Sequence, residues 1–219
     1  PNRLTRLMAD GTLDITFGDE GIVPLAFDAY EITPSVLTSN QDEDLIVGGI
    51  YYAGESTDIA PVLAKYTNAG VLDTTFGDQG IAFLDEISYG NKTVETLATQ
   101  SDGKLVGVSS TGSEIFLFRL LPNGDWDPHF GTNGKISITT GSRGFKVALQ
   151  PQGIIVATAA SEFGSTILVR RYTYTNGDLD TSFGINGESI IQFNEIMLPV
   201  QKVAVTLTNN ILVVTPFAV

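Results

Sequence analysis

The chain has 219 residues, of which 42% are hydrophobic and only 17% charged, and its 12 basic against 25 acidic residues give a net charge of −13. This composition excludes a disordered chain, and the length is enough to bury a sizeable core. The negative charge argues against a nucleic-acid or anionic-lipid partner, because phosphate recognition depends on clustered Lys and Arg. With no Cys and one His, disulfides, thiolate zinc sites and multi-histidine metal sites are excluded.

Short β-branched and aromatic runs recur along the chain. In chain order they predict strands at residues 3–8, 21–27, 44–48, 61–66, 104–108, 115–120, 154–158, 166–172, 202–207 and 211–219. No run keeps a 3.6-residue period, so helix is essentially absent from the prediction. The apolar runs are also too short for a membrane-spanning helix, and we expect no membrane insertion.

Four copies of one fingerprint punctuate these strands. Each copy has a Gly, a large apolar residue followed by Asp, a Phe-Gly pair three residues after that Asp, and a closing Gly. The copies cover residues 11–21, 70–80, 124–134 and 177–187, and their Phe residues are Phe17, Phe76, Phe130 and Phe183. The Phe residues are 59, 54 and 53 positions apart, which indicates a repeat of about 55 residues with about four strands in each.

Four short strands in each repeat predict an all-β fold, a four-bladed β-propeller built from four repeats. The chain length is close to four repeat lengths, and the chain is expected to begin and end in the middle of one repeat. We therefore expect residues 1–219 to form a single domain in which segments 202–207 and 211–219 share one blade with segments 3–8 and 21–27. The alternative is a segment of a longer array, in which case the matching ends are a coincidence.

The fingerprint and the run Gln100 to Val106 resemble the bacterial delta-60 repeat. The copies at residues 68–80, 123–134 and 176–187 follow its pattern well, whereas residues 41–45 and 208–212 lack its Gly. The resemblance implies a propeller that belongs to a bacterial surface or secreted protein. It implies no activity, and a propeller fold hosts many functions.

The repeated aspartate is expected to fix a turn by accepting hydrogen bonds from N–H groups two or three residues on. A residue that occurs once in each blade cannot converge with its copies on one ligand, so we assign it a structural role. A basic residue precedes each Phe by 11 or 12 positions and is expected to pair with that aspartate. The aspartates are Asp14, Asp73, Asp127 and Asp180, and the basic residues are Arg6, Lys65, Arg119 and Arg171.

Three other residue groups attract a functional interpretation that we do not adopt. His129 replaces Thr or Ser in the other copies, so a catalytic role is not expected. Trp126 stands where the other copies have Leu, which favours core packing. Residues 42–44 are acidic, but a calcium-binding loop that began at Asn40 would need Gly at Leu45 and Glu at Tyr51.

Acidic residues gather in the loops that a propeller would turn toward a ligand. If the strand before each of the predicted strands 44–48, 104–108, 154–158 and 211–219 is innermost in its blade, Asp28, Glu31, Asp85 and Glu86 lie in these loops. Glu95, Lys146 and Lys202 would then lie just inside the axial mouth. An acidic mouth suits a cationic partner, or a calcium or other cation in the axial channel. No other cofactor is expected, and the competing interpretation is that loops are simply polar.

The hypothesis from the sequence is a non-enzymatic interaction or scaffold module. The first alternative is a glycan-binding or glycan-hydrolysing propeller, to which Asp85, Glu86 and Tyr89 could contribute from one loop. The second is a structural spacer with no ligand. The sequence identifies neither the protein or small-molecule partner nor the oligomeric state.

Overall fold

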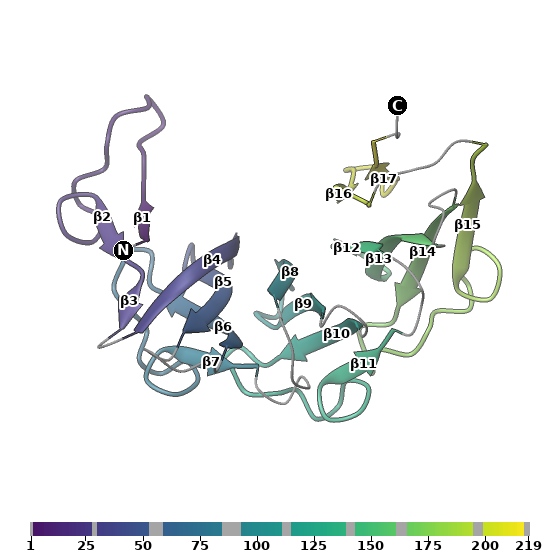
Figure 1. Ribbon diagram of the computed structural model, residues 1–219, viewed down its shortest axis with the longest axis horizontal. Coiled ribbons are helices and arrows are strands. Elements are labelled where there is room, and N and C mark those ends of the chain that lie inside the picture. Colours follow the sequence, from purple (N-terminus) through teal and green to yellow (C-terminus); the bar gives the residue numbers. More distant parts are fainter. Residues whose placement is uncertain are drawn as a thin grey trace. The chain divides into compact units, whose positions relative to one another are not determined.

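A computed structural model describes residues 2–27, 30–52, 59–84, 93–110, 115–138, 143–160, 166–194 and 199–216. All the regular structure in these residues is β-strand, arranged in five sheets (Figure 1). The chain folds into two compact units. The first unit comprises residues 1–105, 109–113 and 120–125, and the second comprises residues 106–108, 114–119 and 126–219.

The first unit begins with a small sheet and continues with a larger one. Strands β1 (Arg3–Thr5) and β2 (Ile22–Pro24) pair with each other antiparallel. The larger sheet has the order β3-β4-β5-β6-β7, with all neighbours antiparallel. Its strands are β3 (Ala26–Phe27), β4 (Tyr30–Ser39), β5 (Leu45–Tyr52), β6 (Ile59–Tyr66) and β7 (Ile81–Phe83).

Three further sheets follow along the chain. One has the order β11-β10-β9-β8, from β8 (Thr93–Thr99), β9 (Leu105–Ser110), β10 (Ile115–Leu120) and β11 (Lys135–Ser137). The next has the order β12-β13-β14-β15, from β12 (Arg143–Gln150), β13 (Gly153–Ala160), β14 (Thr166–Tyr172) and β15 (Glu188–Gln192). The last contains only β16 (Lys202–Val205) and β17 (Ile211–Val214), which are antiparallel.

Each unit has an apolar cluster of its own. In the first unit Phe17, Ile32 and Val62 are buried together with strand residues from the five-stranded sheet. In the second, Ile155, Ala157 and Val169 are buried and half-buried residues of β16 and β17 pack against them. Alternating side chains on antiparallel strands supply these clusters, because every second residue points to the same face of a sheet.

The fingerprint forms the turn that leads from one strand to the next. Its Phe-Gly step places Gly77 at a φ of 56°, in the left-handed region. A Cβ atom at that position would overlap the carbonyl oxygen of Ile81, so the turn requires glycine for both conformation and space. The repeated Gly of the sequence is therefore a backbone requirement of this turn.

The all-β class predicted from the sequence is confirmed. Predicted strands 115–120 and 166–172 coincide with β10 and β14. The predicted strand at 21–27 is divided instead, because the chain changes sheets at Leu25, whose N–H donates to Asn2 O and whose carbonyl oxygen accepts from Ile32 N–H. Within the described ranges we find no helix of the length and apolarity that crossing a membrane requires.

Candidate functional site

The repeated aspartates organise the fingerprint turns by the hydrogen bonds expected from the sequence. Asp14 Oδ1 accepts from Thr16 N at 3.0 Å and from Thr16 Oγ1 at 2.6 Å. Asp73 does the same with Thr75, and Asp180 with Ser182. In the third copy the backbone N–H of His129 donates to Asp127 Oδ1 at 3.0 Å. The side chain of His129 is exposed. In the other three copies a Thr or Ser hydroxyl at this position donates a second hydrogen bond to the aspartate.

The second carboxylate oxygen of each aspartate binds the basic residue of its own repeat. The Nε–Oδ2 distances are 2.8 Å for Arg6–Asp14, 2.8 Å for Arg119–Asp127 and 2.7 Å for Arg171–Asp180. In the second repeat Lys65 Nζ lies 2.9 Å from Asp73 Oδ2. Arg119 and Asp127 form the most buried of these pairs, with each residue 1% exposed.

The three arginines also lie over the fingerprint phenylalanines. The guanidinium carbon is 4.7 Å from the ring centroid of Phe17 for Arg6, 4.4 Å from that of Phe130 for Arg119, and 5.0 Å from that of Phe183 for Arg171. Such stacking is favourable because the ring face carries negative charge. Phe17, Phe76 and Phe130 are fully buried, and Phe183 is half-buried.

Among the described residues, three of the four fingerprints are joined to the next repeat by backbone hydrogen bonds. Gly18 N donates to Ala69 O, Gly77 N to Asn123 O and Gly131 N to Asn176 O, at 2.7 to 2.8 Å. Two arginines strengthen these joints: Arg6 Nη1 donates to Asn68 O, and Arg119 donates to Tyr174 O and Thr175 O. We call this unit of basic residue, aspartate, Phe-Gly and following turn the joint.

Hydrogen bonds hold three of the joint carboxylates in the charged form. The hydroxyl of Thr16 and, more weakly, the Arg6 guanidinium lower the pKa of Asp14. The hydroxyl of Thr75 and the ammonium of Lys65 lower the pKa of Asp73, and Ser182 lowers that of Asp180. Burial opposes the charge of Lys65, but its hydrogen bonds to Asp73 and Asp44 outweigh burial and raise the pKa of Lys65. These groups are permanently charged at neutral pH and act as fixed structural ions.

The residues predicted for the axial mouth lie on three strands. Glu95 is half-buried on β8, in the first unit. In the second unit Lys146 is half-buried on β12 and Lys202 is exposed at the start of β16, and these two strands are neighbours. All three residues lie on the strand that was predicted to be innermost in its repeat. Each of these strands, β8, β12 and β16, is an edge strand of its sheet.

Most of the predicted loop residues lie outside the described residues, among them Asp28, Asp85, Glu86 and Tyr89. Glu31 is described: it lies on β4, where its Oε1 accepts a hydrogen bond from Asn2 N at 2.5 Å. Of the acidic run at 42–44, Asp44 binds Lys65 at 3.1 Å and so serves the second joint. Across the described ranges, no three acidic or His side chains come together in a way that could hold a metal ion.

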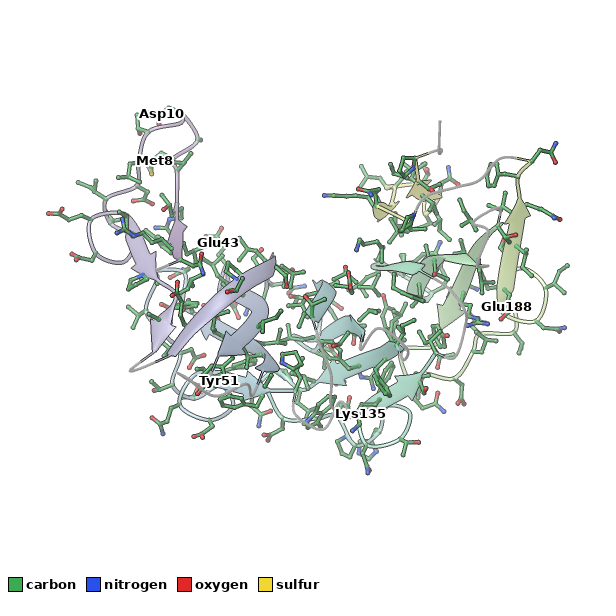
Figure 2. The ribbon with its side chains drawn as sticks, in the orientation of Figure 1. Met8, Asp10, Glu43, Tyr51, Lys135 and Glu188 are labelled. Carbon is green, nitrogen blue, oxygen red and sulfur yellow. The ribbon has the colours of Figure 1, made fainter. Side chains whose placement is uncertain are left out.

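Trp126 is half-buried and does not belong to the buried core, so the core packing predicted from the sequence is only partly correct. Its ring meets Phe118 edge-on with centroids 6.2 Å apart, and Lys135 Nζ lies 5.2 Å from its ring centroid. A hollow of about 620 Å³ lies nearby, between the β10–β11 hairpin and residues 177–188. Arg170 and Glu188, which line it, pair with each other at 2.6 Å, and Figure 2 shows Glu188 at the base of β15.

A second cavity, of about 330 Å³, was not anticipated from the sequence. It lies in the first unit, between the β4–β5 turn and the β8–β9 turn, and Lys65, Phe76 and Pro122 contribute to its walls. One sequence feature does point to this place. The basic residue of the joint is Arg in three repeats and Lys in the second, so this joint holds a shorter cation than the others.

One comparison with known proteins gives a match. Residues 100–130 match the family described as "Domain of unknown function (DUF5122) beta-propeller". This segment contains β9, β10 and the third fingerprint through Phe130, so the match supports a β-propeller repeat in this chain. No curated protein matches the chain at a significant level.

Proposed function

We propose that the chain closes into a four-bladed propeller in which β16–β17 and β1–β2 complete one four-stranded blade. The complete sheets supply the register for this pairing. In the five-stranded sheet Leu45 of β5 lies opposite Tyr66 of β6, and Ile46 lies opposite Lys65. Aligning the repeats on their fingerprints places Ile211 opposite Leu7, Leu212 opposite Arg6 and Val213 opposite Thr5.

The exposure of apolar residues supports this pairing. Leu7 is 61% exposed, Leu212 54% and Val214 56%. Their counterparts in the three complete sheets are buried: Tyr66, Leu120 and Tyr172 for Leu7; Ile46, Val106 and Ile155 for Leu212; Gly48, Val108 and Ala157 for Val214. Pairing β17 with β1 would bury this apolar surface and remove two open sheet edges, both of which favour closure.

The joints support it as well. Gly184 is the fourth-repeat counterpart of Gly18, Gly77 and Gly131, and within the described residues its N–H meets no carbonyl of a following turn. The turn that would receive it belongs to the first repeat, where Asp10 is the counterpart of Ala69. Figure 2 shows Met8 and Asp10 at the tip of the loop that follows β1. In the closed form Gly184 N donates to Asp10 O and Arg171 approaches Ala9 O.

For function, we infer a non-enzymatic interaction or scaffold module of a bacterial surface or secreted protein. The observation that carries this inference is the structural use of the repeated charged residues. Each fingerprint aspartate binds a turn N–H and a basic side chain in its own repeat, and the lowered pKa values of Asp14, Asp73 and Asp180 keep these groups ionised. A carboxylate held in this way neither donates a proton nor turns toward a substrate. Function is thus left to the loops, in which the repeats differ.

The proposed ligand is a cation or a cationic partner at the acidic loops. We infer that the loops with Asp28, Glu31, Asp85 and Glu86 form this face, and that Glu95, Lys146 and Lys202 would line the axial mouth of the closed propeller as an inner ring. The ring contains one acidic and two basic side chains, so it does not attract a cation by itself. We expect the acidic loops to hold the ligand and the ring to set its orientation. A negatively charged face raises the local concentration of cations and steers a basic partner toward it.

The test measures thermal unfolding with calcium, magnesium, zinc, EDTA and a hexalysine peptide. A ligand at 100 times its Kd should stabilise the native protein by about 2.7 kcal/mol. The double variant Asp85→Asn/Glu86→Gln should lose the response. The control Asp19→Asn/Asp78→Asn removes the same charge from exposed fingerprint positions and should keep it. No response to any probe, or an equal loss in both variants, would overturn the loop site.

A further inference from the structure

The second joint differs from the others in the cation that it contains. In the first, third and fourth repeats an arginine stacks on the fingerprint phenylalanine. Arg6 and Arg119 also reach the carbonyl groups of the next turn. Their guanidinium groups therefore fill the space between a phenylalanine ring and the following repeat.

Lys65 does not fill that space. Its single ammonium is held within its own repeat, 2.9 Å from Asp73 Oδ2 and 3.1 Å from Asp44 Oδ2. Among the described residues no cation lies over the ring of Phe76. The 330 Å³ cavity lies here, with Lys65, Phe76 and Pro122 in its walls. Phe76 and Pro122 are the counterparts of Phe130 and Thr175, between which the guanidinium of Arg119 lies in the third joint.

The walls of the cavity present acceptors and negative charge. Gln100 lines it, and the buried Oε1 of Gln100 has no hydrogen-bond partner in the described part of the chain. In the next repeat the counterpart Gln150 Oε1 accepts from the arginine of its own sheet, Arg171 Nη1, at 3.2 Å, whereas the arginine in the sheet of Gln100, Arg119, donates to Asp127, Tyr174 and Thr175. A buried acceptor without a donor is costly, so a donor brought by a ligand is favourable here.

The charges around the cavity sum to a negative value. Asp42 and Asp102 line it, and Asp44 and Asp73 bind Lys65 at its edge. Lys65 and Lys104, which pairs with Asp102 at 2.7 Å, offset two of these four charges. The apolar side chains of Ile46, Phe76 and Leu105 complete the walls. An acceptor-lined cavity with an aromatic face and a net negative charge suits a flat cation with in-plane donors.

We propose that this cavity binds a guanidinium group, supplied either by a small guanidino compound or by an arginine side chain of a partner. The ligand supplies the group that Lys65 lacks: it stacks on Phe76 and donates to Gln100 Oε1. The site lies beyond the proposed loop face, because the β4–β5 and β8–β9 turns are at the ends of β4 and β8 that are opposite those loops. It lies within the first unit and does not require closure of the propeller.

The test is a titration of the whole ¹⁵N-labelled chain with methylguanidinium chloride, followed by amide chemical shifts. We expect saturable shifts at residues 100–105 and around Phe76 and Pro122, and a much weaker response to methylammonium chloride. Lys65→Arg supplies a guanidinium from the chain itself, as Arg6, Arg119 and Arg171 do in the other repeats. Because this group would occupy the cavity, the variant should bind methylguanidinium at least about tenfold more weakly. Lys202→Arg makes the same chemical change at an exposed residue of the second unit that does not line the cavity, and should leave binding unchanged.

A second variant tests the role of Gln100 in a protein that is expected to stay folded. Gln100→Leu removes the unpartnered acceptor, so it should weaken binding while leaving the protein folded and at least as stable. Binding of a Gly-Arg-Gly amide as well as methylguanidinium would identify an arginine side chain as a ligand. Binding of methylguanidinium alone would restrict the site to small compounds. Equal binding of methylammonium, or undiminished binding by Lys65→Arg, would overturn the proposal.

Discussion

Replacing Arg119 with Met removes the cation from the most buried ion pair of the joints. Arg119 and Asp127 are each 1% exposed, and the Nε–Oδ2 distance is 2.8 Å. The substitution leaves a carboxylate buried without its counter-charge, which typically costs about 3–5 kcal/mol of unfolding free energy. It also removes the donors to Tyr174 O and Thr175 O. We expect a loss in that range, measured by urea unfolding followed through the fluorescence of Trp126, the single Trp.

Two further variants make the measurement specific. The double variant Arg119→Met/Asp127→Leu removes both charges, so the part of the loss that comes from the unpaired carboxylate should return. The loss of the bonds to His129 N, Tyr174 O and Thr175 O, about 1 kcal/mol each, should remain. Lys104→Met breaks an equally short but exposed pair with Asp102 and should cost less than about 1 kcal/mol. The reasoning is refuted if Arg119→Met costs no more than Lys104→Met, or if the double variant is no more stable than the single one.

The remaining predictions concern the turn and its carboxylates. Gly77→Ala should lower the unfolding free energy by more than Gly11→Ala, because Gly77 faces Ile81 O and Gly11 faces open space although both have positive φ; urea unfolding of both variants measures this, and equal losses would contradict it. The pKa values of Asp14, Asp73 and Asp180 lie below the ordinary value of 3.8, so their contribution to stability is complete above that pH and is lost as the pH falls through the lowered values. The melting temperature should therefore fall steeply below about pH 4, less so in Thr75→Val, and a flat profile down to about pH 2 would refute this.

Much of the fold could be predicted from the sequence because the repeat is encoded locally. The fingerprint combines glycines that the turn requires with an aspartate that caps it and a phenylalanine that is buried, and these roles depend on residues close in sequence. The pairing of each basic residue with its aspartate also follows from a fixed separation along the chain. Local rules therefore sufficed for the joint and for the most apolar strands, whereas β4, β7, β8, β11, β12 and β15 lie outside the predicted ranges.

Other features depend on contacts between distant segments. The division of residues 21–27 at Leu25 follows from its bonds to Asn2 and Ile32, which no local pattern shows. The cavity beside Phe76 is lined by Lys65, whose ammonium binds Asp44, a residue 21 positions away in the connection between β4 and β5. The role of Asp44 was missed because the acidic run at 42–44 was considered only as a calcium-binding loop. Sequence could reveal the substitution of Lys for Arg but not the space that it leaves.

The closed propeller is tested most directly by a disulfide between β1 and β17. The chain has no cysteine, so Thr5→Cys/Val213→Cys introduces the only pair. Residues opposite each other in an antiparallel pair have Cα atoms about 4.5–5.5 Å apart, which a disulfide can bridge. Thr5→Cys/Leu207→Cys, with its second cysteine in the exposed β16–β17 turn, is the matched control.

Closure predicts that mild oxidation of the Thr5→Cys/Val213→Cys variant gives a monomeric, intramolecular disulfide in most molecules, whereas the control stays reduced. Disulfide-linked dimers in place of the monomeric product would show that β1 and β17 pair between chains, as in an extended array. That outcome, or equal cross-linking of the control, would contradict the four-bladed closure.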